Sequence, residues 1–240
     1  MRRSRLLLAI AVVAATTVLC ALGVWQLRRL AWKEALIATI EARISAPARP
    51  LAEIETRWRE TGDADYFPAW AVGTFRHENE QYFYTTRKGA VGWDVFAPLE
   101  LADGRILMVN RGFVPDARRD PSTRQVGQLS GEQRVEGLAR NPLSEKPNPF
   151  VPDNEPANRT FFWRNLAAMA AAAKIEDNDL VPFFLDAGDS QNPGGLPVGG
   201  STIVDLPNNH LLYAVTWFGL AACCVGVGGA LLLRGARRDS

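Results

Sequence analysis

Cysteine is scarce in this sequence, and the three cysteines that occur are confined to two apolar runs. Cys20 lies in the first run, and Cys223 and Cys224 lie in the second. The polar stretch between the runs therefore contains no cysteine, which excludes a disulfide, a thiol redox centre and a cysteine-based zinc site there. Methionine and histidine are also sparse in that stretch, so a site for a soft metal such as copper is not expected.

Histidine is rarer still, because the chain has only His77 and His210. A Ser-His-Asp or Cys-His hydrolase needs a histidine base beside its nucleophile, and His77 in "FRHENE" is the only candidate between the runs. We interpret His77 as a solvated histidine in a turn, where replacement by alanine should be harmless. No carboxylate pair is marked as a glycosidase pair, and "GGLPVGG" lacks the lysine and helix of a phosphate-binding loop. The chain is therefore not expected to be an enzyme.

Basic residues are absent from Ile175 to Leu233, and then Arg234, Arg237 and Arg238 follow together. This asymmetry predicts a C-terminus in the cytoplasm, or on the matrix side in a mitochondrion, and two membrane spans would put the N-terminus on the same side. The first apolar run is less informative, because it has three basic residues on each flank. Without the six arginines and one aspartate of the two tails, 21 basic and 25 acidic residues remain. The resulting net charge of −4 excludes a nucleic-acid partner.

Two runs carry no charge at all: Leu6–Leu27, with 22 residues, and Leu211–Leu233, with 23. About 20 helical residues cross the hydrocarbon of a bilayer, so each run is long enough to span it. We expect a cytoplasmic tail (1–5), a transmembrane helix (6–27), an extracytoplasmic domain (28–207), a second transmembrane helix (208–233) and a basic cytoplasmic tail (234–240). The first run also resembles a signal peptide with a cleavage site at Ala21-Leu22-Gly23. However, 22 uncharged residues exceed the usual ~7–15 of such a signal, which favours a retained helix.

The polar stretch has the patterns of a small β domain. Helical spacing continues beyond the first run to about Ile44, and "SAPARP" then breaks it. Strands are predicted at "WAVGTF", "QYFYTTR", "WDVFAPLEL", "RILMVNRGFVP", "QRVEGLAR", "VPFFLDAG" and "STIVDL". Asp103-Gly104 marks a hairpin turn, the five prolines between Asn141 and Asn158 predict an irregular excursion, and "NLAAMAAAAKI" predicts the domain's one helix. The fold class is a membrane protein in which two transmembrane helices flank a mostly antiparallel β (α+β) sandwich or barrel.

Polar residues gather at the start of the second run, in "LPNNHLLYAVTWFG". His210, Tyr213, Ala214 and Trp217 have i, i+3, i+4, i+7 spacing, which puts them on one helical face, and Asn208 or Asn209 is suited to cap the helix. Residue types alone favour an aromatic belt at the level of the lipid headgroups, formed by tryptophans 25, 32 and 217 with Tyr213. Two rows of small residues, Ala222-Gly226-Ala230 and Ala11-Ala15, are predicted to let the two helices pack closely.

Three segments together resemble the surfeit locus protein family, whose members are assembly factors of haem-copper cytochrome oxidase. They are "GVWQLRRLAWK" (23–33), "VNRGFVP" (109–115) and "NNHLLYAVTWFGLA" (208–221), in the layout helix, external domain, helix. "VGTF", "GWDVFAPLELADGRILMVNRG" and "VEGLARN" follow the family's order as well. One departure is Phe113, where many members have tryptophan.

The resemblance implies a role at the step where haem a is inserted into the catalytic subunit of the oxidase. It implies that His210 is a haem-iron ligand, that Tyr213, Trp217 and Trp25 contact the macrocycle, and that Arg28 and Arg29 pair with the propionates. The implied partners are that catalytic subunit, haem a synthase and membrane lipid, in the plasma (inner) membrane. The alternative is a scaffold that clamps the nascent subunit without a cofactor. In that case the polar turn at Asn208, Asn209 and His210 recognises the subunit.

Overall fold

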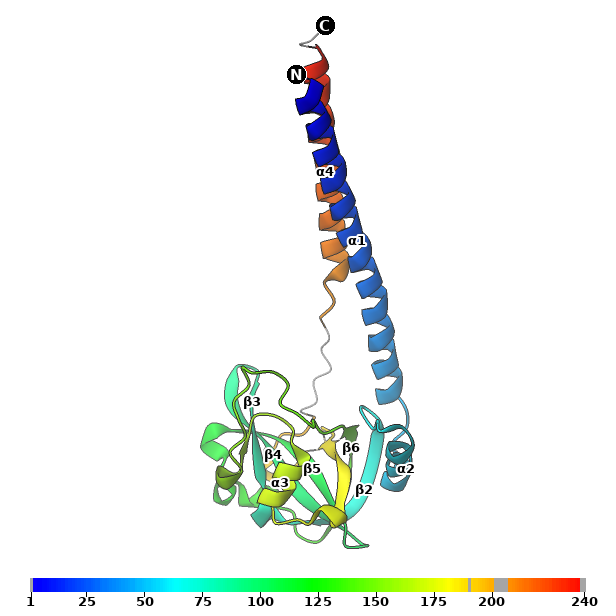
Figure 1. The fold of residues 1–240 in the computed structure, drawn as a ribbon. Coiled ribbons are helices and arrows are strands. Elements are labelled where there is room, and N and C mark those ends of the chain that lie inside the picture. Colours follow the sequence, from blue (N-terminus) through cyan, green and yellow to red (C-terminus); the bar gives the residue numbers. More distant parts are fainter. Residues whose placement is uncertain (1, 190, 201–206, 238–240) are drawn as a thin grey trace. The chain divides into compact units, whose positions relative to one another are not determined.

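The computed structural model describes residues 2–189, 191–200 and 207–237, and the chain divides into two units (Figure 1). The first unit is Met1–Ile40 with Asp205–Ser240, and the second is Glu41–Val204. The long helices are α1 (Arg2–Ile44) and α4 (His210–Arg237). The end of α1 at Ile44 confirms the predicted continuation of the helix beyond its apolar run. The predicted strand "STIVDL" lies outside the described residues.

Both long helices are candidates for crossing a membrane. The segments Arg3–Ile44 and His210–Arg234 satisfy the length and hydropathy that a bilayer requires, with mean hydropathies of 2.6 and 1.9. Only 6% and 11% of their apolar windows are buried within the molecule, which distinguishes them from the core helix of a soluble protein. Leucines and valines cover the exposed surfaces instead, for example Leu7 at 66% and Val227 at 62% exposure. Such continuous apolar surface is typical of contact with lipid or protein.

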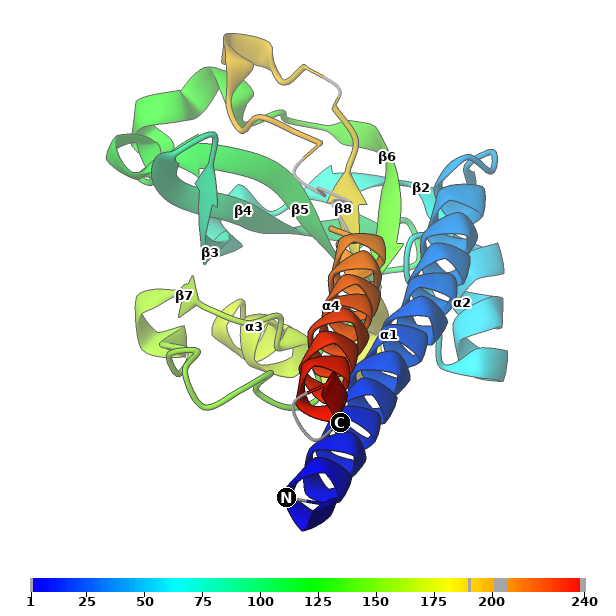
Figure 2. The same ribbon diagram turned by 90° about the horizontal axis from the view of Figure 1, so that it is seen from above.

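The two helices lie side by side within the first unit in both views (Figures 1 and 2). They are antiparallel, because Gly23 lies against Phe218 and Gly228 lies against Val12. Besides Gly229 and Leu232 near the end of the helix, the α4 positions that are at least partly buried are His210, Ala214, Trp217, Ala221, Cys224 and Gly228. Their alternating spacing of four and three residues is the seven-residue repeat of a coiled coil.

The prediction that two rows of small residues form the contact between the helices is wrong. Ala11, Ala15, Ala222, Gly226 and Ala230 are all exposed. A row with a strict four-residue step drifts around the helix, whereas two helices that stay in contact over several turns need the 3.5-residue average. The small residues that α4 presents to α1 are therefore seven apart, at 214, 221 and 228.

The second unit is a β-barrel with added strands. The strands are β1 (Arg49–Pro50), β2 (Pro68–Phe75), β3 (Gln81–Arg87), β4 (Ala90–Leu101), β5 (Ile106–Pro115), β6 (Glu132–Arg140), β7 (Thr160–Phe161) and β8 (Leu180–Ala187). Their order is β1-β2-β6-β8-β5-β4-β3-β7, and β2 also pairs with β4. This extra pairing closes a ring of five strands, β2, β6, β8, β5 and β4. Of the two folds predicted, sandwich or barrel, the described strands form the barrel.

Most strand pairs are antiparallel, as predicted, but β5 and β8 run parallel inside the ring. Closure depends on Gly73 in β2, because a Cβ there would lie 2.3 Å from the carbonyl oxygen of Glu100 in β4. The hairpin between β4 and β5 turns at Asp103-Gly104, where Gly104 has φ = +85°. That φ is in the left-handed region that glycine adopts without strain.

Alternate residues of the ring strands enter two separate cores, which explains their nearly continuous apolar sequences. In β5, Leu107 and Val109 join one cluster, while Ile106 and Met108 join the other. The first cluster is covered by α2 (Leu51–Thr61), and the second is covered by α3 (Leu166–Ala172). Figure 2 shows α2 and α3 on different sides of the sheet.

The prediction of a single helix in the domain is wrong, because α2 was missed. Its sequence "LAEIETRWRET" has charged or polar residues at seven of its positions and buries only Leu51, Ile54 and Glu55. A helix with so narrow an apolar face has a weak hydrophobic signal. The proline-rich segment contains only a short 3₁₀ turn at Pro156–Asn158, in agreement with the predicted excursion.

Candidate functional site

The end of the hairpin where α4 begins carries a polar contact between the two long helices. His210 is the first residue of α4, and its Nδ1 lies 2.7 Å from Oε1 of Gln26 in α1. Gln26 lies on the face of α1 that contacts α4, between the at least partly buried positions Gly23 and Leu30, and is only 8% exposed. A buried amide needs a hydrogen-bond partner, and His210 provides it. The sequence pattern indicates His210, but no pattern in the sequence marks Gln26.

The other residues predicted for this site differ in how far their side chains are exposed. Trp217 shares the partly buried face of α4 with His210 and Ala214, as its spacing predicts. Tyr213 lies beside this face and is 54% exposed. On α1, Trp25 is 56% exposed, and Arg28 and Arg29 are also exposed.

Arg29 is held by an aromatic neighbour on its own helix. Its guanidinium carbon lies 3.9 Å from the ring centroid of Trp32, a cation–π contact along one face of α1. Trp25, Arg29 and Trp32 have i, i+4, i+7 spacing and form one stripe, about 100° around the helix from Gln26. These exposed side chains therefore lie on the α1 surface beside the face that contacts α4.

The turn before α4 leaves an acceptor without a partner. The backbone carbonyl of Asn209 accepts a hydrogen bond from the backbone N–H of Tyr213, which makes Asn209 the residue that flanks the helix. The side-chain oxygen Oδ1 of Asn208 is buried, and no described group donates to it. A buried amide oxygen in this state is a ready acceptor for a donor from another molecule.

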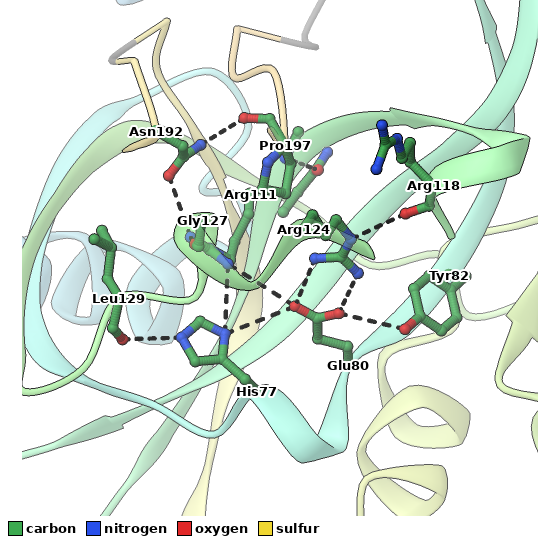
Figure 3. A network of polar contacts seen from close by, with 12 residues as sticks. His77, Glu80, Tyr82, Arg111, Arg118, Arg124, Gly127, Leu129, Asn192 and Pro197 are labelled. Carbon is green, nitrogen blue, oxygen red and sulfur yellow. Dashed lines mark hydrogen bonds and ion pairs between the residues drawn. The ribbon is translucent and has the colours of Figure 1, made fainter. Parts of the chain in front are cut away.

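A second polar cluster lies in the β domain around Glu80 (Figure 3). Glu80 is fully buried and accepts hydrogen bonds from Arg124, one of them at 3.2 Å, and from Tyr82 at 3.3 Å. Arg111 of β5 also lies 3.8 Å from Glu80 and donates to the carbonyl oxygen of Gly127 at 2.6 Å. Burial raises the pKa of the Glu80 carboxyl, but the contacts with His77, Arg124 and Arg111 outweigh it, so the pKa lies below its usual range. Burial lowers the pKa of Arg111 to about 10.

His77 belongs to this cluster, so its interpretation as a solvated turn residue is wrong. It does lie in a turn, the 3₁₀ segment His77–Asn79, but its side chain is only 15% exposed. Its Nε2 lies 2.9 Å from the carbonyl oxygen of Leu129, and its Nδ1 lies 3.4 Å from Nη1 of Arg111. Arg111 lies in the "VNRGFVP" segment, so that segment has a structural role in the centre of the domain. His77→Ala is no longer expected to be harmless.

A third cluster joins β4, β5 and β8. Asp186 of β8 accepts from Arg164 at 3.0 Å and from Asn110 of β5 at 3.2 Å. Asp94 of β4 lies at a register shift in the strand, and its Oδ1 is buried with no hydrogen-bond donor among the described residues. Burial, with a further contribution from the charge of Asp186, raises the pKa of Asp94 to about 6.

The donor chemistry at the Gln26–His210 contact is compatible with haem but not with a bare metal ion. Among the described residues, no group of three or more His, Cys, Asp or Glu is arranged to hold a bare metal ion. Haem needs only one or two protein ligands, because its porphyrin supplies the rest. His210 has one ring nitrogen bonded to Gln26, and within the described part of the chain no group bonds the other. Aromatic and guanidinium groups of the types that contact a macrocycle and its carboxylates stand nearby.

The comparisons with known proteins cover both helices and the domain between them. Residues 13–222 match the SURF1 family. The chain is 34% identical over 231 residues to the SURF1-like protein of Monosiga brevicollis, covering 91% of this chain and 85% of that one. It is 38% identical over 232 residues to Surfeit locus protein 1 of Homo sapiens, covering 89% and 74%. The SURF1-like protein of Drosophila melanogaster is 32% identical over 220 residues, covering 84% and 69%.

Proposed function

The chain belongs to the SURF1 family, and from that premise we propose that it is an assembly factor for haem-copper cytochrome c oxidase. It acts where haem a enters the catalytic subunit, or it stabilises that subunit while haem a enters. Its partners are the catalytic subunit, haem a synthase and membrane lipid. It works as a non-enzymatic chaperone in the inner membrane, with both termini in the cytoplasm.

The observation that carries this proposal is the His210–Gln26 contact at the end of an apolar helix pair. His210 is the residue that would hold haem iron, and bound haem would supply a metal centre that an imidazole nitrogen can ligate. Trp217, Tyr213 and Trp25 offer aromatic surface to the macrocycle. Arg28 and Arg29 attract the propionates, but they are exposed, so water and salt weaken that attraction.

A cofactor-free scaffold is the second candidate, and the Asn208 turn favours it. The buried Oδ1 of Asn208 gains a hydrogen bond if a donor from the oxidase subunit reaches it. Tyr213 and Trp25 would then be anchors in a protein interface, a role for which exposed aromatic residues are well suited. In this case the protein clamps the nascent subunit through its two helices.

The absorption spectrum of the purified protein separates the two candidates. Full-length protein is purified in detergent from cells that make haem a, and three forms are compared at equal concentration: wild type, His210→Ala and Leu212→Ala. Leu212 is a matched control, because it lies in the same turn of α4 and is 68% exposed. We expect haem a in wild type and Leu212→Ala, and its loss in His210→Ala. Absence of haem from wild type, or full retention by His210→Ala with the same bands, favours the scaffold.

A further inference from the structure

Gln26 is an unusual residue for the inner face of an apolar helix pair. It occupies a buried position on the face through which α1 contacts α4, and apolar or small residues occupy the neighbouring positions Gly23 and Leu30. Burying an amide in such surroundings is unfavourable unless its polar atoms are bonded. The one hydrogen bond of its side chain within the described residues is to Nδ1 of His210, at 2.7 Å.

The atoms of this contact determine where the imidazole carries its hydrogen. Oε1 of Gln26 only accepts hydrogen bonds, so Nδ1 of His210 must be the donor. A neutral imidazole has one N–H, which leaves the lone pair of His210 on Nε2. No described group bonds Nε2, so this lone pair is available.

His77 has the opposite arrangement and serves as an internal comparison. Its Nε2 faces the carbonyl oxygen of Leu129 at 2.9 Å, so Nε2 carries the hydrogen. In the neutral form of His77 the lone pair is on Nδ1, which lies 3.4 Å from the guanidinium of Arg111 and 3.7 Å from Oε1 of Glu80. The two histidines of the chain are therefore opposite tautomers, and only His210 has a lone pair that no described group uses.

We propose that Gln26 is a positioning residue that fixes His210 as the Nδ1–H tautomer and directs Nε2 to haem iron. This inference rests on the proposed function. Metal-bound histidines generally donate their other N–H to an acceptor, which fixes the ring and makes the ligating nitrogen more basic. Gln26 provides that acceptor from the opposite helix. Ligand geometry therefore depends on α1 and α4 remaining paired.

The tautomer can be measured without haem, because the ¹⁵N shifts of an imidazole distinguish its protonated nitrogen from its bare one. Full-length protein labelled with ¹⁵N-histidine gives two pairs of ring-nitrogen signals in detergent, one pair per histidine, at about pH 8 where a free imidazole is neutral. His77→Gln assigns them. We expect a protonated Nδ1 for His210 and a protonated Nε2 for His77. A protonated Nε2 on His210 in wild type would overturn the proposal.

Variants of Gln26 test the link to haem. Gln26→Leu keeps the size of the side chain but removes the acceptor, so His210 should lose its Nδ1–H preference. Affinity for added haem a should fall by about 10-fold or more, as is usual when such an acceptor is removed. Gln26→Glu keeps an acceptor and should retain the tautomer and the affinity for added haem a. Thr17→Val is the control, because it removes a polar group from an exposed face of the same helix.

The outcomes separate the inference from the function on which it rests. If wild type binds haem a and Gln26→Leu changes neither the tautomer nor the affinity, Gln26 is a packing residue and the inference is wrong. If wild type binds no haem a, the haem function itself is wrong, and the ligand role of His210 is wrong with it. If Gln26→Leu loses affinity for haem a and Gln26→Glu keeps it, the result supports both the positioning role of Gln26 and the haem function.

Discussion

At neutral pH, the buried charge of Asp94 lowers the stability of the β domain. Its pKa is raised from the ordinary 3.8 to about 6, because burial disfavours the charged carboxylate. The penalty is absent below the unfolded-state pKa, develops as the pH rises from about 4 to 6, and is complete above that range. A shift of about two pKa units corresponds to about 3 kcal/mol at most.

Asp94→Asn should therefore stabilise the protein at pH 7.5 and have little effect at pH 4. Thermal unfolding of the full-length protein, followed by near-ultraviolet circular dichroism, measures this difference. Asp103→Asn is the matched control. Arg105 lowers the pKa of this half-exposed carboxyl, so its pKa shift is opposite in sign to that of Asp94. It should leave stability at pH 7.5 unchanged or slightly lower. Equal stabilisation by Asp94→Asn at both pH values would contradict the assigned pKa.

Glu80 is the only carboxylate within contact distance of two buried arginines among the described residues. Glu80→Gln keeps the shape of the side chain but leaves Arg111 and Arg124, each no more than 5% exposed, without a counter-charge. Removing one partner of a buried ion pair typically costs about 3–5 kcal/mol. We expect a loss of that order in the free energy of unfolding in urea. Glu78→Gln, an exposed change in the same turn, should lose nothing measurable.

Residue spacing reveals some of these contacts and hides others. His210, Ala214 and Trp217 were placed on one face from the helical period, because that period is a local property of the chain. The Glu80 cluster joins side chains that are 44 residues apart in the case of Glu80 and Arg124. No local pattern marks such a contact, and a buried arginine in "VNRGFVP" has the same letter as a surface arginine. The same limit applies to Gln26, whose partner is 184 residues away.

Individual strands of the barrel were predictable, but their closure was not. Six of the seven predicted strands coincide with β2, β3, β4, β5, β6 and β8, because β-branched and aromatic runs bounded by turn residues are a strong local signal. The parallel pairing of β5 with β8 and the closing contact of β2 with β4 depend on long-range packing. The two-residue strands β1 and β7 are too short to have any pattern at all.

Two glycines of α4 provide a test of the helix pairing, because only one of them lies close to α1. A Cβ on Gly228 would lie 2.5 Å from a methyl group of Val12, whereas a Cβ on Gly226 would meet nothing within 4 Å. Gly228→Leu should therefore push α1 and α4 apart, because overpacking a close contact costs about 1–3 kcal/mol. Gly226→Leu should leave the pair intact.

Energy transfer between fluorophores at the two chain ends reports on this pairing, because the described ends of α1 and α4 belong to the same unit. We expect transfer in detergent to fall in Gly228→Leu and to match wild type in Gly226→Leu. The opposite result would restore the row at 222, 226 and 230 as the contact surface.

The arginines predict how the whole molecule is oriented in a membrane. The basic residues after the second span predict a cytoplasmic C-terminus, and two spans then put the β domain on the other side. A reporter that is active only outside the cytoplasm should be silent when fused after Ser240. The same reporter should be active when inserted at Asn148, within the proline-rich excursion. The reverse pattern would show that the membrane orientation is inverted.

The place of β8 in the barrel has a consequence for incomplete chains. Among the ring strands, β8 is the last to be synthesised, yet it lies between β5 and β6 and pairs with both. A product that stops before Leu180, whether through a nonsense codon or a stalled ribosome, leaves the facing edges of those two strands open. Unpaired edges recruit other strands, so such fragments should aggregate or be degraded rather than persist as inert pieces.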